Sequence, residues 1–156
     1  MSLNVVPPDA LEESRLGWYG ERIFHVLYGW MPQGEKEYLL LDCEHYGRYG
    51  LELAARHRDC LVIVAQVFPQ GGIEVCRIGA QIASMRDLAN VKFLVASAHR
   101  LPFPSEMFSA AATFQAEELQ EPMSFFAELT RVVKPGGKVV AVVPNRRCVP
   151  LRVIRW

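Results

Sequence analysis

Apolar residues along the chain fall into two alternating patterns. Short, unbroken apolar runs are typical of strands buried on both faces of a sheet, and apolar residues at every third or fourth position are typical of helices. The unbroken runs predict five strands: YLLLDC (38–43), CLVIVAQVF (60–68), VKFLVAS (91–97), FSAAATF (108–114) and KVVAVVP (138–144). The helical spacing predicts helices over 9–30, 49–57, 73–88 and 123–133.

The first predicted helix carries most of the aromatic residues of the N-terminal region. Its apolar stripe is expected to face the core. The helix is expected to be interrupted near Gly17 and Gly20, because glycine weakens a helix interior. We expect Trp18, Tyr19 and Trp30 to pack in the core; the alternative is that they form a lid over a ligand pocket.

Continuously apolar strands that alternate with helices predict an α/β fold with a mostly parallel sheet of about five core strands, flanked by helices. The prediction is a single domain over 1–156, with an N-terminal helix at 9–30, a core at 37–145, and a tail or edge strand at 146–156. In such sheets the ligand crevice lies beyond the carboxyl ends of the strands. Candidate site residues are therefore those that directly follow each strand.

Composition and charge exclude several classes of function. The 17 basic and 17 acidic side chains cancel, so nothing favours a nucleic acid or an anionic membrane as a partner. No apolar run approaches the roughly 20 residues of a membrane helix, and the N-terminus does not resemble a signal peptide. The 4 cysteines show no metal-ligand spacing. We therefore expect a reduced, cytoplasmic protein without a metal.

The segment 90–145 resembles the class I S-adenosylmethionine-dependent methyltransferases that act on small molecules. The resemblance lies in the order of its pieces: a strand, the loop LPFP (101–104), a small-residue strand, and a helix ending in VVKPGG (132–137) before another strand. Upstream, GRYGLELAAR (47–56) looks like the end of the family's glycine-rich loop and its helix. The resemblance implies a Rossmann-like methyltransferase fold that lacks the last two strands of the family.

The resemblance also implies where a cofactor would bind, and this chain departs from the family there. The ribose carboxylate at the end of the second strand is replaced by Gln66, and the Asp after the third strand by Ser97. Glu44, His45 and Tyr46 stand where the family has small residues, and the Tyr or His side chain is expected to project toward the cofactor. The candidate cofactor-binding residues are Asp42, Glu44, Gly47, Gln66, Ser97, Ala98 and Gln115.

Three functional hypotheses remain open at this point. The chain is an S-adenosylmethionine-dependent methyltransferase-like protein with weak or lost cofactor binding, an inactive scaffold or partner subunit, or a binder of another nucleotide-like ligand. No catalytic residue is assigned. Glu44 with His45 could form a catalytic pair, and Glu118 could accept a proton. Adjacency alone does not create catalytic geometry, however, and a carboxylate at a helix start is more often stabilised by the helix dipole.

Without the family's last two strands, the strand 138–144 becomes an open sheet edge. The tail CVPLRVIRW (148–156) has alternating apolar residues and is one candidate to cover it. A second copy of the chain is the other candidate. The prediction is a homodimer through the edge near Lys138–Pro144 together with the C-terminal tail.

Overall fold

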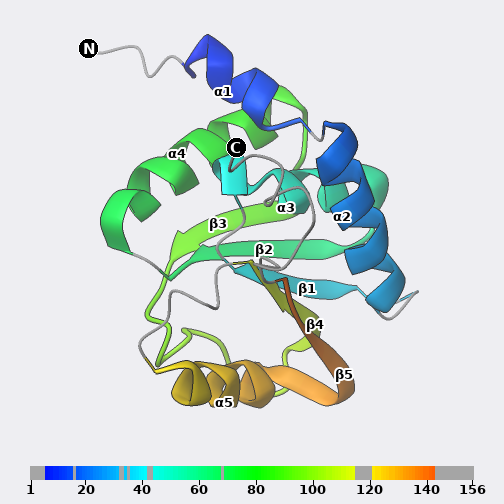
Figure 1. The fold of residues 1–156 in the computed structure, drawn as a ribbon, viewed down its shortest axis with the longest axis vertical. Helices are drawn as coiled ribbons and strands as arrows, with labels where there is room; N and C mark the ends of the chain where they lie inside the picture. Colours follow the sequence, from blue (N-terminus) through cyan, green and yellow to red (C-terminus); the bar gives the residue numbers. More distant parts are fainter. Residues whose placement is uncertain are drawn as a thin grey trace, which may run out of the picture.

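The computed structural model describes residues 6–15, 17–31, 34, 36–41, 44–67, 69–114 and 121–142. These residues form five helices and five strands that alternate along most of the chain (Figure 1). The elements are α1 (Pro8–Glu13), α2 (Trp18–Trp30), β1 (Glu37–Leu41), α3 (Glu44–Arg56), β2 (Leu61–Gln66), α4 (Pro69–Met85), β3 (Val91–Val95), β4 (Phe108–Thr113), α5 (Pro122–Val132) and β5 (Val133–Ala141).

The five strands form one sheet in the order β3-β2-β1-β4-β5, and every neighbouring pair is parallel. At its centre, Leu41 of β1 lies level with Ala65 of β2 and with Thr113 of β4. The predicted α/β fold with a parallel sheet of five strands is therefore confirmed. None of the described helices combines the length and the apolar character that a membrane span requires.

Each face of the sheet packs against its own hydrophobic core. Side chains such as Leu40, Val64 and Ala112 lie in the core shared with α2, α3 and α4. Their neighbours Leu39 and Ala111 point the other way, into the core shared with α5. Successive strand residues alternate between the faces, and both faces of β1, β2 and β4 are covered. This double burial explains why most residues of these strands are apolar.

The N-terminal region forms two separate helices, α1 and α2, so the interruption expected near Gly17 is a complete break in the helix. Gly17 is the N-cap residue of α2 and has extended backbone angles. The expected core packing of the tryptophans is wrong, because Trp18 is 74% exposed and Trp30 is 61% exposed. Phe24 and Leu27 are the buried aromatic and aliphatic residues of α2 instead. The buried stripe of α2 is narrower than its apolar stripe.

The last strand begins earlier than predicted. The sequence Pro-Gly-Gly was expected to form a turn before a strand at 138–144, but β5 already pairs at Val133 with Phe108. The pairing then shifts, and Lys138 lies opposite Ala110. Gly136, with φ of +81°, lies in this irregular stretch. The Pro-Gly-Gly sequence therefore makes a bulge inside the strand, where a positive φ is tolerated by glycine.

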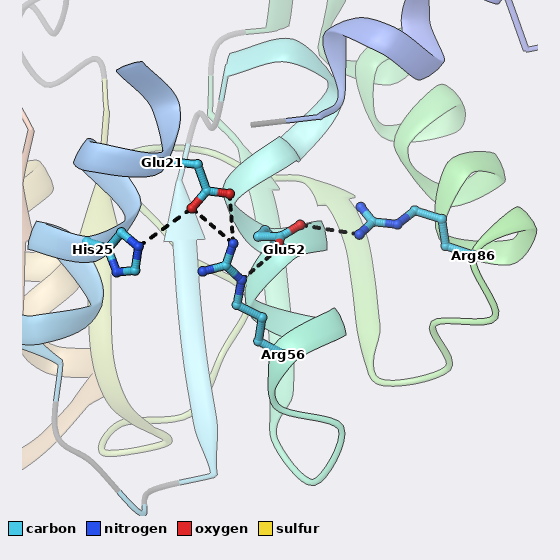
Figure 2. A network of polar contacts seen from close by, with 5 residues as sticks. All are labelled: Glu21, His25, Glu52, Arg56 and Arg86. Atoms are coloured by element: carbon cyan, nitrogen blue, oxygen red, sulfur yellow. Dashed lines mark hydrogen bonds and ion pairs between the residues drawn. The ribbon is translucent and has the colours of Figure 1, made fainter. Parts of the chain in front are cut away.

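A network of ion pairs joins α2, α3 and the turn that follows α4 (Figure 2). Arg56 donates hydrogen bonds to Glu52 at 2.6 Å and to Glu21 at 2.8 Å, and Arg86 contacts the other oxygen of Glu52 at 3.3 Å. The Arg56 guanidinium also lies over the ring of Phe24, 4.5 Å from its centroid. Burial disfavours the charged form of Arg56, but the hydrogen bonds to both glutamates outweigh this effect and raise its pKa.

The loop LPFP is anchored to α5 by one ion pair. Glu128 accepts a hydrogen bond from the Leu101 N–H at 3.0 Å, and Arg131 donates to the carbonyls of Phe103 at 2.9 Å and Leu101 at 3.2 Å. Arg131 also bonds Glu128 at 2.8 Å. The hydrogen bond from Arg131 holds the pKa of Glu128 below its usual value, and the Leu101 N–H adds to the effect.

Replacing Glu128 by Gln should lower the free energy of unfolding by about 1–2 kcal/mol at pH 7, because charge-assisted hydrogen bonds to the loop are lost. A carboxyl group with a lowered pKa stabilises the fold above its unfolded pKa, and this contribution is lost as the pH falls through the folded pKa. The difference between wild type and Glu128→Gln should therefore shrink below about pH 4. Urea unfolding across this range measures it.

Glu74→Gln is the matched control, since Glu74 also pairs with an arginine three residues along its helix but is 58% exposed and holds no loop. An equal loss of stability in both variants would contradict the anchoring role of Glu128.

Candidate functional site

The carboxyl ends of β1, β2 and β4 lie side by side and define the candidate site. Leu41, Ala65 and Thr113 are level with one another, so Gln66 lies one residue beyond this line. In a parallel sheet this is the edge at which ligands bind. Of the candidate residues, Asp42 and Gln115 lie outside the described residues, as does the side chain of Glu44.

The segment that opens α3 follows a left-handed backbone path. His45, Tyr46 and Gly47 have φ values of +48°, +59° and +79°. Glycine adopts this conformation freely, whereas each residue with a side chain pays about 1–2 kcal/mol. The backbone thus runs as a glycine-rich loop would, although two of the three residues are not glycine. His45 reaches toward α1, where its Nδ1 lies 3.7 Å from Glu13.

Gly47 lies where the loop contacts the sheet. A Cβ at this position would lie 2.7 Å from the ring of Phe93 and 3.1 Å from a methyl group of Val64. Gly79 of α4 meets the same ring, since its Cβ would lie 2.5 Å from Phe93 and 2.7 Å from the Tyr46 carbonyl oxygen. Gly47 was predicted to bind the cofactor; that role stays a prediction, and the packing role is an additional one.

Gln66 has a buried donor without an acceptor. Its side chain lies at the end of β2 and is 8% exposed, and its Nε2 has no hydrogen-bond partner among the described residues. By strand alternation it points to the same face as Val62 and Val64, the face covered by α3 and α4. Buried polar atoms are nearly always paired, so an unpaired one at a sheet edge marks a place for a ligand or a water molecule.

A second such group was not anticipated from the sequence. Thr113, at the end of β4, is fully buried, and its Oγ1 also has no partner among the described residues. Its neighbours on either side, Ala112 and Phe114, point into the core under α3, so Thr113 points to the α5 face. A hydroxyl residue ending a strand of alanines was the signal that could have identified it.

Ser97 and Ala98 follow β3 but face different surroundings. The Ser97 hydroxyl accepts the His99 N–H at 3.3 Å, and the Ser97 carbonyl accepts the Arg100 N–H at 3.2 Å, so Ser97 stabilises its own turn. Ala98 is buried in the core on the α5 face, with Leu101. Gly47, Gln66 and Ser97 therefore lie on the loops or strand end at the candidate site, whereas the side chain of Ala98 belongs to the core.

Comparisons with known proteins show similarity over most of this fold. Residues 49–141 match the sequence profile of a family described as a methyltransferase domain. The chain belongs to the class I S-adenosylmethionine-dependent methyltransferase family. A demethylmenaquinone methyltransferase from Geobacillus sp. (strain WCH70) is 31% identical over 105 residues, which are 62% of this chain and 45% of that protein.

Solved structures show the same relationship. The [4+2]-cyclase SpnF shares 28% identity with a TM-score of 0.67, over 78% of this chain and 44% of that one. A methyltransferase from Aquifex aeolicus, 20% identical with a TM-score of 0.64 over 83% of this chain and 68% of that one, shares the fold. The chain spans less than half the length of its curated methyltransferase relative.

The described residues fit S-adenosylmethionine only in part. The left-handed path at the start of α3 keeps the backbone close to the sheet, as a cofactor loop requires. The two ribose hydroxyls, however, are donors that are best bound by a carboxylate, which offers two acceptor oxygens. Gln66 offers one acceptor oxygen and places a donor in the same site. The residue at the end of β2 therefore does not match a ribose diol.

Replacing Gly47 by Ala should destabilise the fold more than the same change at Gly136. Both residues have φ near +80°, but a Cβ at Gly136 meets open space, whereas a Cβ at Gly47 meets Phe93. The shared backbone cost is about 1–2 kcal/mol. The contact with the ring should add roughly 1–3 kcal/mol at Gly47. Chemical unfolding of both variants measures the difference.

The variant Phe93→Leu removes the ring and should recover part of the Gly47→Ala loss in a double-mutant cycle. Equal losses at Gly47 and Gly136, with no coupling to Phe93, would show that the loop does not pack as described.

Proposed function

We propose that this chain is an S-adenosylmethionine-dependent methyltransferase-like protein whose cofactor binding is weak. The observation that carries the proposal is the buried Gln66 at the end of β2, with its Nε2 unpaired among the described residues. The family relationship supports a cofactor of this kind. The neutral amide supports a low affinity, and we assign no catalytic residue. We also propose a cytoplasmic location, in keeping with the buried thiols Cys60 and Cys76; the Cys76 Sγ donates a hydrogen bond to the Leu94 carbonyl at 3.2 Å.

The expected loss of affinity follows from the strength of charged hydrogen bonds. A hydrogen bond to a charged group contributes about 1.5–3 kcal/mol, roughly twice a neutral one. One lost charge-assisted bond therefore weakens binding by roughly tenfold, and two by about a hundredfold. Ser97, which already bonds the His99 N–H within its own turn, is a second neutral residue at this edge. Neither side chain supplies a carboxylate.

A role as a non-catalytic partner subunit is the second candidate function. It is favoured by an exposed apolar surface on α2, where Val26 and Trp30 are 63% and 61% exposed. Exposed apolar patches of this kind mark interaction surfaces on soluble proteins. Binding of another nucleotide-like ligand is the third reading, and adenosine serves as its probe below.

The variant Gln66→Glu should bind S-adenosylmethionine and S-adenosylhomocysteine about tenfold more tightly than the wild type, because it restores a carboxylate facing the ribose. Isothermal titration calorimetry measures both affinities. Without ligand, Gln66→Glu should melt at a lower temperature than the wild type, because an unpaired carboxylate is then buried. Ligand at 100 times Kd should stabilise it by about 2.7 kcal/mol.

Gln81→Glu on α4 is the matched control, since it adds the same charge beside Arg77 and away from the strand ends. Equal gains in both variants would assign the effect to net charge. No binding of either ligand at millimolar concentration, by wild type or Gln66→Glu, would overturn the cofactor proposal and leave the partner-subunit role. If adenosine binds as tightly as S-adenosylmethionine, the methionine part adds no affinity. That result would favour the third function, binding of another nucleotide-like ligand.

A further inference from the structure

A groove runs between α2 and the open edge of the sheet. Its volume is about 620 Å³, and we call it the α2–β5 groove. Apolar side chains make most of its wall: Ile23, Val26 and Trp30 from α2, Val139 and Val140 from β5, and Val142 directly after it. Arg22 of α2 also lines the groove. Three of them are well exposed, with Val26 at 63%, Trp30 at 61% and Val139 at 38%. Val142, the last of the described residues, lies in the wall of the groove.

The backbone of β5 offers free pairing groups beside this groove. β5 is the last strand of the sheet, and no other strand of the described residues pairs with its outer side. The Val142 N–H donates to the Thr113 carbonyl at 2.8 Å, so Val142 directs its backbone groups toward β4. Because these directions alternate along a strand, Val140 does the same, while Val139 and Ala141 direct their N–H and C=O groups outward.

We propose that the outer edge of β5 and the α2–β5 groove form a self-association surface, occupied by a second copy of this chain. An antiparallel arrangement about a two-fold axis at Val140 places Val139 opposite Ala141 of the second copy. Both residues direct their backbone groups outward, so each such pair exchanges two hydrogen bonds. The outward groups are symmetric about Val140, which makes the edge complementary to itself.

The charges on β5 are compatible with this pairing. Lys138 is the charged residue of the segment 138–142, and the two-fold axis places it opposite Val142 of the second copy. The two lysines are then four residues apart along the strands, about 14 Å. That separation exceeds the screening length of about 8 Å at physiological salt. In each copy, the Lys138 ammonium stays over its own Trp30, 5.9 Å from the ring centroid.

Exposed apolar side chains lie beside the proposed strand pairing. Val26 and Trp30 of α2 and Val139 of β5 are the exposed members of this patch, and apolar patches of this kind mark interaction surfaces. The two-fold axis is perpendicular to the sheet, so it brings the α2 helices of both copies to the same face. Each copy then contributes its apolar patch and its strand edge.

The first experiment measures the oligomeric state of the full chain by sedimentation equilibrium. The wild type should be a dimer, and Val26→Glu should weaken the dimer at least tenfold by placing a charge in the groove. Ile73→Glu is the matched control, because Ile73 is an apolar helix residue, 74% exposed, outside the groove. It should leave the dimer unchanged. Circular dichroism confirms that each variant is folded.

The second experiment tests the register by cross-linking. The proposed axis places the two copies of residue 140 directly opposite each other, about 4.5 Å apart between Cα atoms, which suits a disulfide. Val140→Cys in a Cys148→Ser background should therefore form a covalent dimer on oxidation. Lys138→Cys in the same background should not, since its two copies lie about 14 Å apart.

Three results would overturn the proposal. A monomeric wild type at roughly 100 μM, a dimer equally sensitive to Val26→Glu and Ile73→Glu, and cross-linking through residue 138 but not 140 each exclude this interface. If the wild type is monomeric and Leu151→Glu makes it associate, then residues 143–156 cover the edge within one chain. Binding of an unrelated strand peptide by a monomeric wild type would instead assign the edge to a different partner.

Discussion

The close approach of α3 and α4 to the sheet is the constraint on which the rest of the structure depends. Gly47, Gly50 and Gly79 lie where a Cβ would collide with Phe93 or Val64, and at Gly50 the overlap with Val64 is the most severe of the three. The glycines allow both helices to rest directly on β2 and β3. The contact between Gly79 and the Tyr46 carbonyl also positions the segment that opens α3. The left-handed path of His45 and Tyr46 is thus supported by packing.

This constraint explains how the fold and the binding site can change independently. The fold requires small residues at the helix contacts and apolar residues on the strands, and neither requirement involves the side chains at the carboxyl edge. A carboxylate at the end of β2 would stabilise a ribose but would destabilise the empty protein, because it would be buried without a partner. Gln66 carries less of this penalty, since one lost neutral hydrogen bond costs less than an unpaired charge. The presence of the fold therefore does not predict how tightly the chain binds the cofactor.

Sequence patterns predicted the elements that are buried on both faces, and were least informative at the edge of the sheet. Continuous apolar runs located β1, β2 and β4 because every residue of β4, and every residue after the first in β1 and β2, is buried. The same patterns predicted that Trp30 would be buried, because helical spacing does not say how far the sheet extends beneath a helix. Pro-Gly-Gly is compatible with a turn and with a bulge, so the sequence predicted a turn where β5 has a bulge. The sequence did not identify Thr113, because the lack of a hydrogen-bond partner for its hydroxyl depends on its three-dimensional surroundings.

The candidate site and the proposed interface meet at the carboxyl end of β4 and β5. The Val142 N–H bonds the carbonyl of Thr113, whose own hydroxyl is buried and unpaired among the described residues. Val142 also lines the α2–β5 groove. A ligand that ordered the end of β4 would therefore change the free energy of the strand edge that a second copy would pair with, and pairing would change the affinity of the site by the same factor. The ratio of the ligand affinities of the isolated and the associated chain would therefore equal the factor by which the ligand changes self-association.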